Sequence, residues 1–281
     1  MASLKRILLF AHYDPDDLYL APTLTYLNEL KKHCEYCVLC STGISEAAAK
    51  IFNGMLDSVI LRANVGYDFL SWKIALNQVS NILCNYDEIV FCNDSVFAPY
   101  GDFNLIFSKM SDSPFDFWGL TQNRQFAPHV QSYFVVYKKK VFTSTVFKTF
   151  WDEVEALPNK WDIILKYEVG LSQKLTKAGF LMGSFFNPTR FQELSVLFRN
   201  LVFKRHGKID SLKNLLHGNR AAINFTIDAP VLLLEQGVPM VKREALLRNP
   251  SQVHLPTLLK LMNQKNFELT TALSKILKPL N

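Results

Sequence analysis

The order of apolar segments in the first third of the chain constrains its fold more than any other feature. Short apolar runs typical of buried strands alternate there with longer segments whose apolar residues recur at helical spacing. Strands are expected at 5–12, 37–40, 58–61 and 88–92, and helices at 18–32, 45–55 and 69–83. This alternation predicts an α/β fold with a mostly parallel central sheet and helices on both faces.

The pattern becomes less regular after residue 115. Strands are expected at 115–120, 132–137 and 180–183, with one helix through Phe147 and Trp151 and another over 161–178 that is interrupted near Tyr167. Residues 195–281 show helical spacing with turns at glycine and proline. We therefore predict one domain over 1–195 and a helical, basic extension over 196–281 that packs on it.

Composition excludes several classes of protein. With 281 residues, 49% of them hydrophobic and 20% charged, the chain is neither disordered nor a small disulfide-stapled scaffold. No apolar stretch approaches the roughly 20 residues of a bilayer span, and the run at 7–11 is too short for a signal peptide. We therefore expect a cytoplasmic protein.

Positive charge is concentrated at the C-terminal end. Residues 199–281 carry 13 basic and 5 acidic side chains, whereas residues 1–198 carry 18 and 20. Basic residues and leucines are interleaved over 199–220 and again over 255–280. Such a surface suits peripheral contact with an anionic membrane, but the same leucines would equally pack these helices onto the rest of the protein.

The spacing of three cysteines suggests a metal centre, which the strand pattern excludes. Side chains alternate between the two faces of a strand, so Cys37 and Cys40 point to opposite sides and cannot share one zinc or iron–sulfur centre with Cys34. Free thiols in apolar surroundings are typical of a reducing compartment.

Ligands of parallel sheets bind beyond the carboxyl ends of the strands, so the residues after each strand are the candidates for a site. After the first strand, His12 to Asp17 resembles the Ala-His-Pro-Asp-Asp signature of zinc-dependent sugar N-deacetylases, but Tyr13 and Asp14 interrupt it. The alternative is that His12 is a polar residue at a strand end that caps the next helix together with Asp16.

Two further motifs follow the third and fourth strands. They are Asn64-x-Gly66-x-Asp68 and Asn93-Asp94-Ser95. Their order is similar to that in glycosyltransferases with the nucleotide-diphospho-sugar fold, where carboxylates hold Mg²⁺ or Mn²⁺ against the donor diphosphate; Asp94 is then the candidate metal ligand. The alternative is an ordinary turn, because Asn-Asp-Ser is common in turns and helix caps.

The helix expected over 161–178 offers a candidate general base. Its segment from Tyr167 to Phe180 resembles the acidic helix start of inverting transferases, where a carboxylate removes the proton of the acceptor hydroxyl. Val169 stands where those enzymes have a second acid, so only Glu168 remains for this role. The alternative is that Glu168 merely complements the helix dipole.

Taken together, these motifs resemble the rhamnan synthesis protein F family. The resemblance runs in order over roughly residues 5–250 and rests on Asn64 to Lys73, Asn93 to Pro99, Asp116 to Thr121, His129 to Phe134, Phe150-Trp151, Tyr167 to Gly170 and Gly237 to Pro250. It implies a GT-A-type nucleotide-diphospho-sugar transferase fold. It also implies a glycosyltransferase, with rhamnose favoured, that extends a lipid-linked chain of a bacterial surface polysaccharide or O-antigen.

Roles for individual residues follow from this resemblance and from their places after strands. The donor is expected to contact His12, Asn64, Gly66, Asp68, Asn93, Asp94, Ser95, Lys242, Arg243 and Arg248. The acceptor is expected to contact Trp118, Thr121, His129, Gln131 and Ser132, although Trp118 would otherwise be core and the others an ordinary polar turn. No nucleic acid partner is expected, and a lipid-linked acceptor would place the protein at the inner face of the cell membrane.

Two other functions remain open from the sequence. One is the zinc-dependent sugar N-deacetylase. The other is a sugar-binding subunit of a polysaccharide assembly complex that keeps the fold but lacks turnover, which Val169 and the reduced motif around Asp94 make reasonable.

Overall fold

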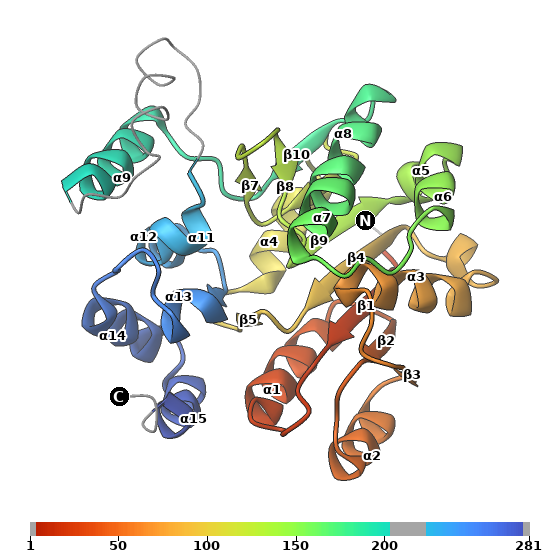
Figure 1. The fold of residues 1–281 in the computed structure, drawn as a ribbon, viewed down its shortest axis with the longest axis horizontal. Coiled ribbons are helices and arrows are strands. Elements are labelled where there is room, and N and C mark those ends of the chain that lie inside the picture. Colours follow the sequence, from red (N-terminus) through yellow and green to blue (C-terminus); the bar gives the residue numbers. More distant parts are fainter. Residues whose placement is uncertain (1–3, 203–222, 278–281) are drawn as a thin grey trace.

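The computed structural model describes residues 4–202 and 223–277 (Figure 1). Its first part consists of β1 (Arg6–His12), α1 (Leu20–Lys31), β2 (Tyr36–Ser41), α2 (Glu46–Met55), β3 (Ser58–Leu61), α3 (Tyr67–Val79) and β4 (Glu88–Asn93). Each strand and helix predicted in this part is present. The helix predicted to reach residue 83 ends earlier, because Leu83–Asn85 forms a separate 3₁₀ turn.

The middle of the chain adds shorter elements. They are β5 (Val96–Phe97), α4 (Phe103–Ser111), β6 (Phe117–Gly119), β7 (Gln122–Asn123), β8 (His129–Val130), β9 (Phe134–Lys138), α5 (Lys139–Phe142), α6 (Thr145–Asp152), α7 (Lys160–Ile163), the π-helical turn η2 (Ile164–Val169), α8 (Gly170–Lys177) and β10 (Met182–Ser184). The interruption predicted near Tyr167 is this π-helical turn.

Seven strands form one sheet in the order β10-β6-β9-β4-β1-β2-β3. β1 pairs in parallel with β2 and β4, and β3 extends the parallel part from β2. β9 runs antiparallel to both β4 and β6. The predicted α/β class with a mostly parallel central sheet is confirmed, and the carboxyl ends of β1 to β4 meet at one edge, where such sheets bind ligands.

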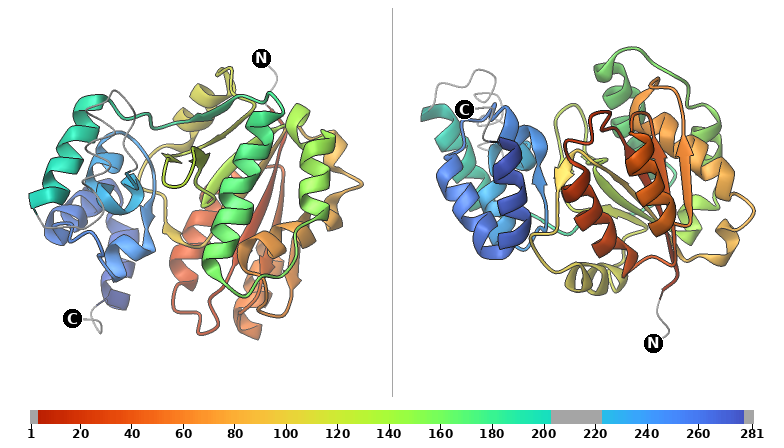
Figure 2. Two further views of the ribbon diagram at one scale, coloured as in Figure 1. Left: turned by 45° about the horizontal axis from the view of Figure 1, so that its top comes forward. Right: turned by 90° about the horizontal axis from the view of Figure 1, so that it is seen from below.

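Helices cover both faces of the sheet (Figure 2). Each face has its own apolar core. Leu8 and Cys37 face one core together with α1, α2 and α4. Leu9 and Cys40 face the other core together with α3, α6 and α8. The two thiols therefore lie on opposite faces, which confirms the argument against a shared metal centre.

The C-terminal region is helical, as predicted. It consists of α9 (Arg190–Val202), α11 (Phe225–Asp228), α12 (Pro230–Glu235), β11 (Val241–Lys242), α13 (Arg243–Leu247), α14 (Leu255–Lys265) and α15 (Phe267–Leu277), which lie together on one side of the sheet in Figure 1. β11 pairs antiparallel with β5 and so joins this region to the segment that follows β4. The predicted division between residues 195 and 196 falls within α9 and remains a prediction.

The amphipathic helices at the end of the described chain pack within the protein. Leu258 and Met262 of α14, with Leu269 and Leu273 of α15, are buried in a third core beside Phe97. For these helices the packing alternative therefore holds. The basic residues of 204–220, on which the membrane prediction also rests, lie outside the described residues. Within residues 4–202 and 223–277, no helix combines the length and apolarity needed to cross a bilayer.

Candidate active site

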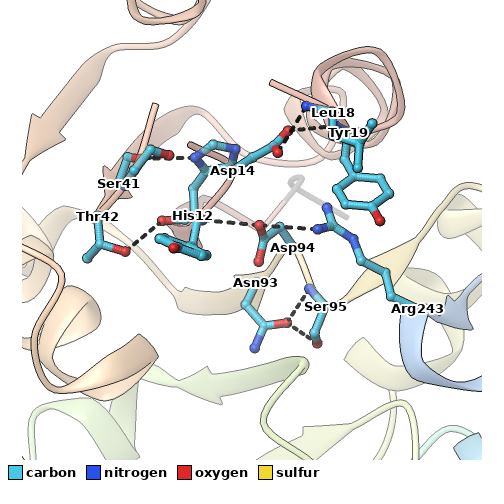
Figure 3. Close-up of polar contacts among 12 residues, drawn as sticks. His12, Asp14, Leu18, Tyr19, Ser41, Thr42, Asn93, Asp94, Ser95 and Arg243 are labelled. Carbon is cyan, nitrogen blue, oxygen red and sulfur yellow. Dashed lines mark hydrogen bonds and ion pairs between the residues drawn. The ribbon is translucent and has the colours of Figure 1, made fainter. Parts of the chain in front are cut away.

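The turn after β4 lies at the middle of the carboxyl edge of the sheet. Figure 3 shows the polar contacts of its residues. Asp94 Oδ2 accepts a hydrogen bond of 3.1 Å from the backbone N–H of Tyr13, which follows β1. The same oxygen lies 3.5 Å from Nη1 of Arg243. Because β1 and β4 are neighbours in the sheet, the residues after both strands meet here, as the sequence predicts.

A chain of hydrogen bonds runs through this turn from Asp68 to Lys242. Asn93 Nδ2 donates to Asp68 Oδ2 over 2.7 Å, and Asn93 Oδ1 accepts from the hydroxyl of Ser95. That hydroxyl oxygen accepts in turn from Lys242 Nζ over 3.0 Å. Burial, reinforced by the neighbouring negative charge of Asp94, raises the pKa of Asp68 to about 6.

The C-terminal region brings two cations to this edge. β11 lies against β5, so Lys242 and Arg243 stand beside Ser95, whose carbonyl accepts from the N–H of Arg243. The guanidinium of Arg243 lies over the ring of Tyr19 at 4.3 Å, and the ammonium of Lys242 lies over Tyr133 at 5.0 Å. Burial lowers the pKa of Lys242, against the opposing effect of Glu168 and Asp68.

Glu168 is a third carboxylate facing the same space. Its charge acts on both Asp68 and Lys242. Its Oε2 accepts a short hydrogen bond from Ser132 Oγ, and its Oε1 lies 3.3 Å from Nε2 of His129. Burial alone would raise the pKa of Glu168, but His129, Ser132 and Lys242 outweigh this effect and lower it. The carboxylate is therefore ionised at neutral pH.

The π-helical turn η2 positions this carboxylate. Such turns insert an extra residue into a helix and occur frequently at functional sites. His129 Nδ1 lies 2.8 Å from the carbonyl of Ala127 and so carries a proton that it donates there. This leaves Nε2 of His129 to face Oε1 of Glu168.

Three predicted acceptor residues are not brought to this space. Trp118 is fully buried in the core. The hydroxyl of Thr121 is buried and bonded to the side chains of Gln131 and Tyr133, both over 2.8 Å. Gln131 is itself buried, so these groups satisfy each other. The structure therefore does not support the acceptor contacts predicted for Trp118, Thr121 and Gln131.

Arg248 is also set apart from the other predicted cations. It is exposed just after α13, whereas Lys242 and Arg243 are largely covered.

His12 is not placed as a zinc ligand. Its Nδ1 lies 2.9 Å from the hydroxyl of Ser41, and burial lowers its pKa despite the nearby charge of Asp94. The carboxylate of Asp14 accepts hydrogen bonds from the N–H groups of Leu18 and Tyr19 in the loop before α1. α1 has no side-chain cap, so the cap by His12 and Asp16 that the alternative supposed is not formed. In the part of the chain that the structure describes, no three His, Cys, Asp or Glu side chains are grouped to hold a metal ion. The deacetylase alternative therefore has no support.

Asn64 and Gly66 line a pocket of about 410 Å³ between 64–67 and 156–158. Gly66 has a φ of +73° at the start of α3, and a Cβ there would lie 3.1 Å from the Cα of Ala156. A left-handed residue with this close approach requires glycine. Tyr67 also lines the pocket and Asp68 follows it, so the pocket borders the edge that carries Asp94.

The tyrosines beneath the two cations were not predicted. Tyr133 lies within the segment His129 to Phe134 that resembles the family, so the sequence did point to this part of the chain. Tyr19 stands in the loop before α1 and meets Arg243 from the opposite end of the chain, so no local pattern pointed to it.

The comparison with protein families decides the family of this chain. The model of the family described as rhamnan synthesis protein F matches residues 36–211, more than half of the sequence. The chain belongs to the rhamnan synthesis protein F family. The predicted resemblance is confirmed, and it supports the predicted enzyme class, a glycosyltransferase.

Curated relatives of this rhamnan synthesis protein F family member are distant. Virulence protein VirA of Vibrio anguillarum is 28% identical over 201 residues, which cover 69% of this chain and 64% of VirA. The uncharacterized protein y4gN of Sinorhizobium fredii is 24% identical over 147 residues, which cover 51% of this chain and 38% of y4gN. The chain thus spans less than two thirds of the length of either relative.

Solved structures show weaker similarity to this family member. The mannosyltransferase PcManGT of Pyrobaculum calidifontis, in complex with GDP-Man and Mn²⁺, has a TM-score of 0.41 at 12% identity and covers 91% of this chain and 73% of its own. The glycosyltransferase GlyE of Streptococcus pneumoniae has a TM-score of 0.40 at 13% identity and covers 74% and 51%.

Proposed function

We propose that this protein transfers a sugar, with rhamnose favoured, from a nucleotide-diphospho-sugar to a lipid-linked chain of a growing bacterial surface polysaccharide or O-antigen. One observation carries the proposal. In a member of the rhamnan synthesis protein F family, Asp68, Asp94 and Glu168 meet Lys242 and Arg243 at the carboxyl edge of the sheet. Such a cluster supplies both charges that the reaction needs, a base for the acceptor and cations for the leaving diphosphate.

The donor is proposed to lie along this edge. The pocket beside Asn64 and Gly66 receives the nucleoside, and Asp68 binds its ribose. Asp68 accepts a hydrogen bond of 2.7 Å from Asn93 at the end of β4, so the proposed ribose site adjoins the turn after β4. The diphosphate is proposed to lie at Lys242 and Arg243 beside this turn, with Asn93 and Ser95 holding Lys242 in position.

A divalent metal fits this site only when the donor shares it. Proteins usually hold Mg²⁺ through one or two carboxylates together with substrate phosphates, and Asp94 with the neighbouring Asp68 offers such a pair. Bound Mg²⁺ or Mn²⁺ would add positive charge at the departing diphosphate. Asp94 is the proposed ligand, and Arg243 supplies a positive charge at the same carboxylate.

Glu168 is the proposed general base. The proton of the acceptor hydroxyl passes to its carboxylate while the hydroxyl oxygen bonds to the anomeric carbon of the donor. The bond from that carbon to the diphosphate breaks, and its electron pair leaves with the β-phosphate oxygen. A single displacement of this kind inverts the anomeric carbon. Ser132 and His129 hold the carboxylate in position for it.

The protein is proposed to work in the cytoplasm, where nucleotide sugars are available and the inner face of the cell membrane is accessible. A lipid-linked acceptor requires the enzyme to approach that face. The basic C-terminal region is the proposed point of peripheral contact.

A donor screen with an Asp94→Asn variant tests the function. A nucleotide sugar at 100 times its Kd adds about 2.7 kcal/mol to the free energy of unfolding, which a thermal-shift screen with and without Mn²⁺ detects. The variant should fold, lose most of this donor stabilisation and lose most transfer to a rhamnose oligosaccharide. Near-normal transfer by the variant would contradict the role of Asp94. Donor binding by the unmodified protein without any transfer would instead indicate a sugar-binding subunit.

A further inference from the structure

Two large aromatic side chains stand exposed beside the site. Phe126 is 66% exposed and Trp161 is 60% exposed. Their ring centroids lie 6.2 Å apart with an angle of 71° between the planes. Burial of apolar surface is what an aromatic residue contributes to folding, and both residues keep most of theirs in water. The fold therefore does not explain why these two positions are aromatic.

The backbone of Phe126 strengthens this point. Its φ is +70°, in the left-handed region that glycine adopts freely and that strains a bulky residue. A phenylalanine here thus strains the chain and buries little in return. Conformations of this kind cluster at active sites and ligand clamps, where the surroundings hold them in place.

The aromatic pair joins the same two segments as the proposed catalytic dyad. Phe126 lies in the loop between β7 and β8, and β8 begins with His129; Trp161 lies in α7, which continues through η2 to Glu168. The loop is anchored to α8 by a hydrogen bond of 2.6 Å from Gln173 Nε2 to the carbonyl of Pro128. At 1.5 Å per residue, Trp161 stands about 10 Å along the helix from Glu168.

The start of α7 also lies near the cations of the site. The charge of Lys160 acts on Lys242, so these residues lie within electrostatic reach of each other. The aromatic pair therefore stands on the segments that carry His129 and Glu168, about 10 Å along the helix from the proposed base.

We propose that Phe126 and Trp161 form a platform on which an outer sugar ring of the acceptor glycan stacks. This inference rests on the proposed function, because it names a second contact of the acceptor at that site. A sugar ring presents a face of C–H groups, which packs against the electron-rich face of an aromatic ring. A growing glycan extends away from the hydroxyl that reacts at Glu168, so its outer units can reach a platform about 10 Å along the helix from this residue.

Tryptophan fluorescence tests this contact without requiring turnover. Trp72, Trp118 and Trp151 are buried, so Trp161 is the tryptophan that acrylamide quenches readily. A rhamnose hexasaccharide should reduce this quenching, and rhamnose alone should do so much less. In a Trp161→Phe variant, the tryptophan fluorescence that acrylamide quenches readily should be lost, together with its response to the hexasaccharide. Quenching that the hexasaccharide leaves unchanged would contradict the platform.

A Phe126→Gly variant separates binding from folding. Glycine relaxes the left-handed backbone, so the melting temperature should stay the same or rise. The acceptor KM should rise about tenfold, and kcat and the donor KM should stay nearly unchanged. The reason is that the lost contact binds the acceptor equally well in the ground state and in the transition state. Phe267→Ala removes an equally exposed aromatic side chain from α15 and should change neither KM.

The outcomes distinguish this inference from the function on which it rests. An unchanged acceptor KM in Phe126→Gly would overturn the platform, and a raised donor KM would overturn it by assigning the pair to the nucleotide. If the hexasaccharide protects Trp161 from acrylamide but the protein transfers no sugar, the platform would be supported and the proposed transferase activity contradicted.

Discussion

Asp68 is a carboxylate whose position costs the protein stability. Its pKa of about 6 in the folded protein lies above the ordinary value of 3.8, so ionisation of Asp68 opposes folding. Below about pH 4 the group is protonated in both folded and unfolded protein, and the cost is absent. The cost grows between pH 4 and 6 and stays constant above. A residue retained at such a cost is expected to serve the site.

Replacing this carboxylate should therefore stabilise the protein in a pH-dependent manner. Asp68→Asn keeps an oxygen that accepts from Asn93, so it should raise the free energy of unfolding at pH 7 by on the order of 2 kcal/mol. The gain should vanish near pH 4, which urea unfolding at the two pH values measures. Donor binding should weaken in the same variant. A variant that is less stable at pH 7, or a gain independent of pH, would contradict the assigned pKa.

Glu168 allows a second test at the scale of single residues. Glu168→Gln keeps an oxygen that accepts from Ser132, so the segment around it should stay in place. Loss of a general base lowers turnover by about 10² to 10⁴, and donor Kd should remain nearly unchanged. Single-turnover kinetics and donor titration measure the two quantities separately. If donor binding weakens as much as turnover, Glu168 binds the donor or supports the structure instead.

The sequence identified which residues stand at the edge of the sheet better than it identified their partners. Asp94 and Asp68 could be placed there because each follows a strand or opens a helix, which local patterns reveal. Thr121 and Gln131 also follow or precede strands, but their polar groups bond each other in the interior. A local pattern gives the position of a polar residue along a strand and does not show whether another side chain already satisfies it.

At the scale of elements, periodicity predicted the parallel part of the sheet because the apolar repeat of a strand or helix is local. The pairing of β11 with β5 had no such signal. Each is two residues long, and their pairing joins distant parts of the chain. Lys242 and Arg243 were assigned to the donor through the family resemblance, and this short ladder is the physical feature that brings them beside Ser95. The break near Tyr167 was predicted, but its π-helical form was not.

At the scale of the whole molecule, α9 is the described element with an outward apolar face that suits a membrane. Phe191 is 78% exposed and Phe198 is 70% exposed, and Leu194 stands between them on the same face at helical spacing. On its other side, Val196 and Leu197 are buried. The most basic part of the sequence, residues 199–281, begins within this helix. The membrane hypothesis therefore rests on α9 rather than on α14 and α15.

Co-sedimentation with liposomes tests this hypothesis. Basic residues near an anionic surface contribute up to about 1 kcal/mol each, and this attraction falls with salt. The protein should therefore bind vesicles containing phosphatidylglycerol at low salt more tightly than neutral phosphatidylcholine vesicles. Exchanging both exposed aromatic residues in Phe191→Ser/Phe198→Ser should weaken binding several-fold without lowering the melting temperature, because neither side chain is buried. Phe267→Ala on α15 is the matched control and should bind as the unmodified protein does. Binding that is absent at low salt, or equal for both lipids, would contradict membrane attachment.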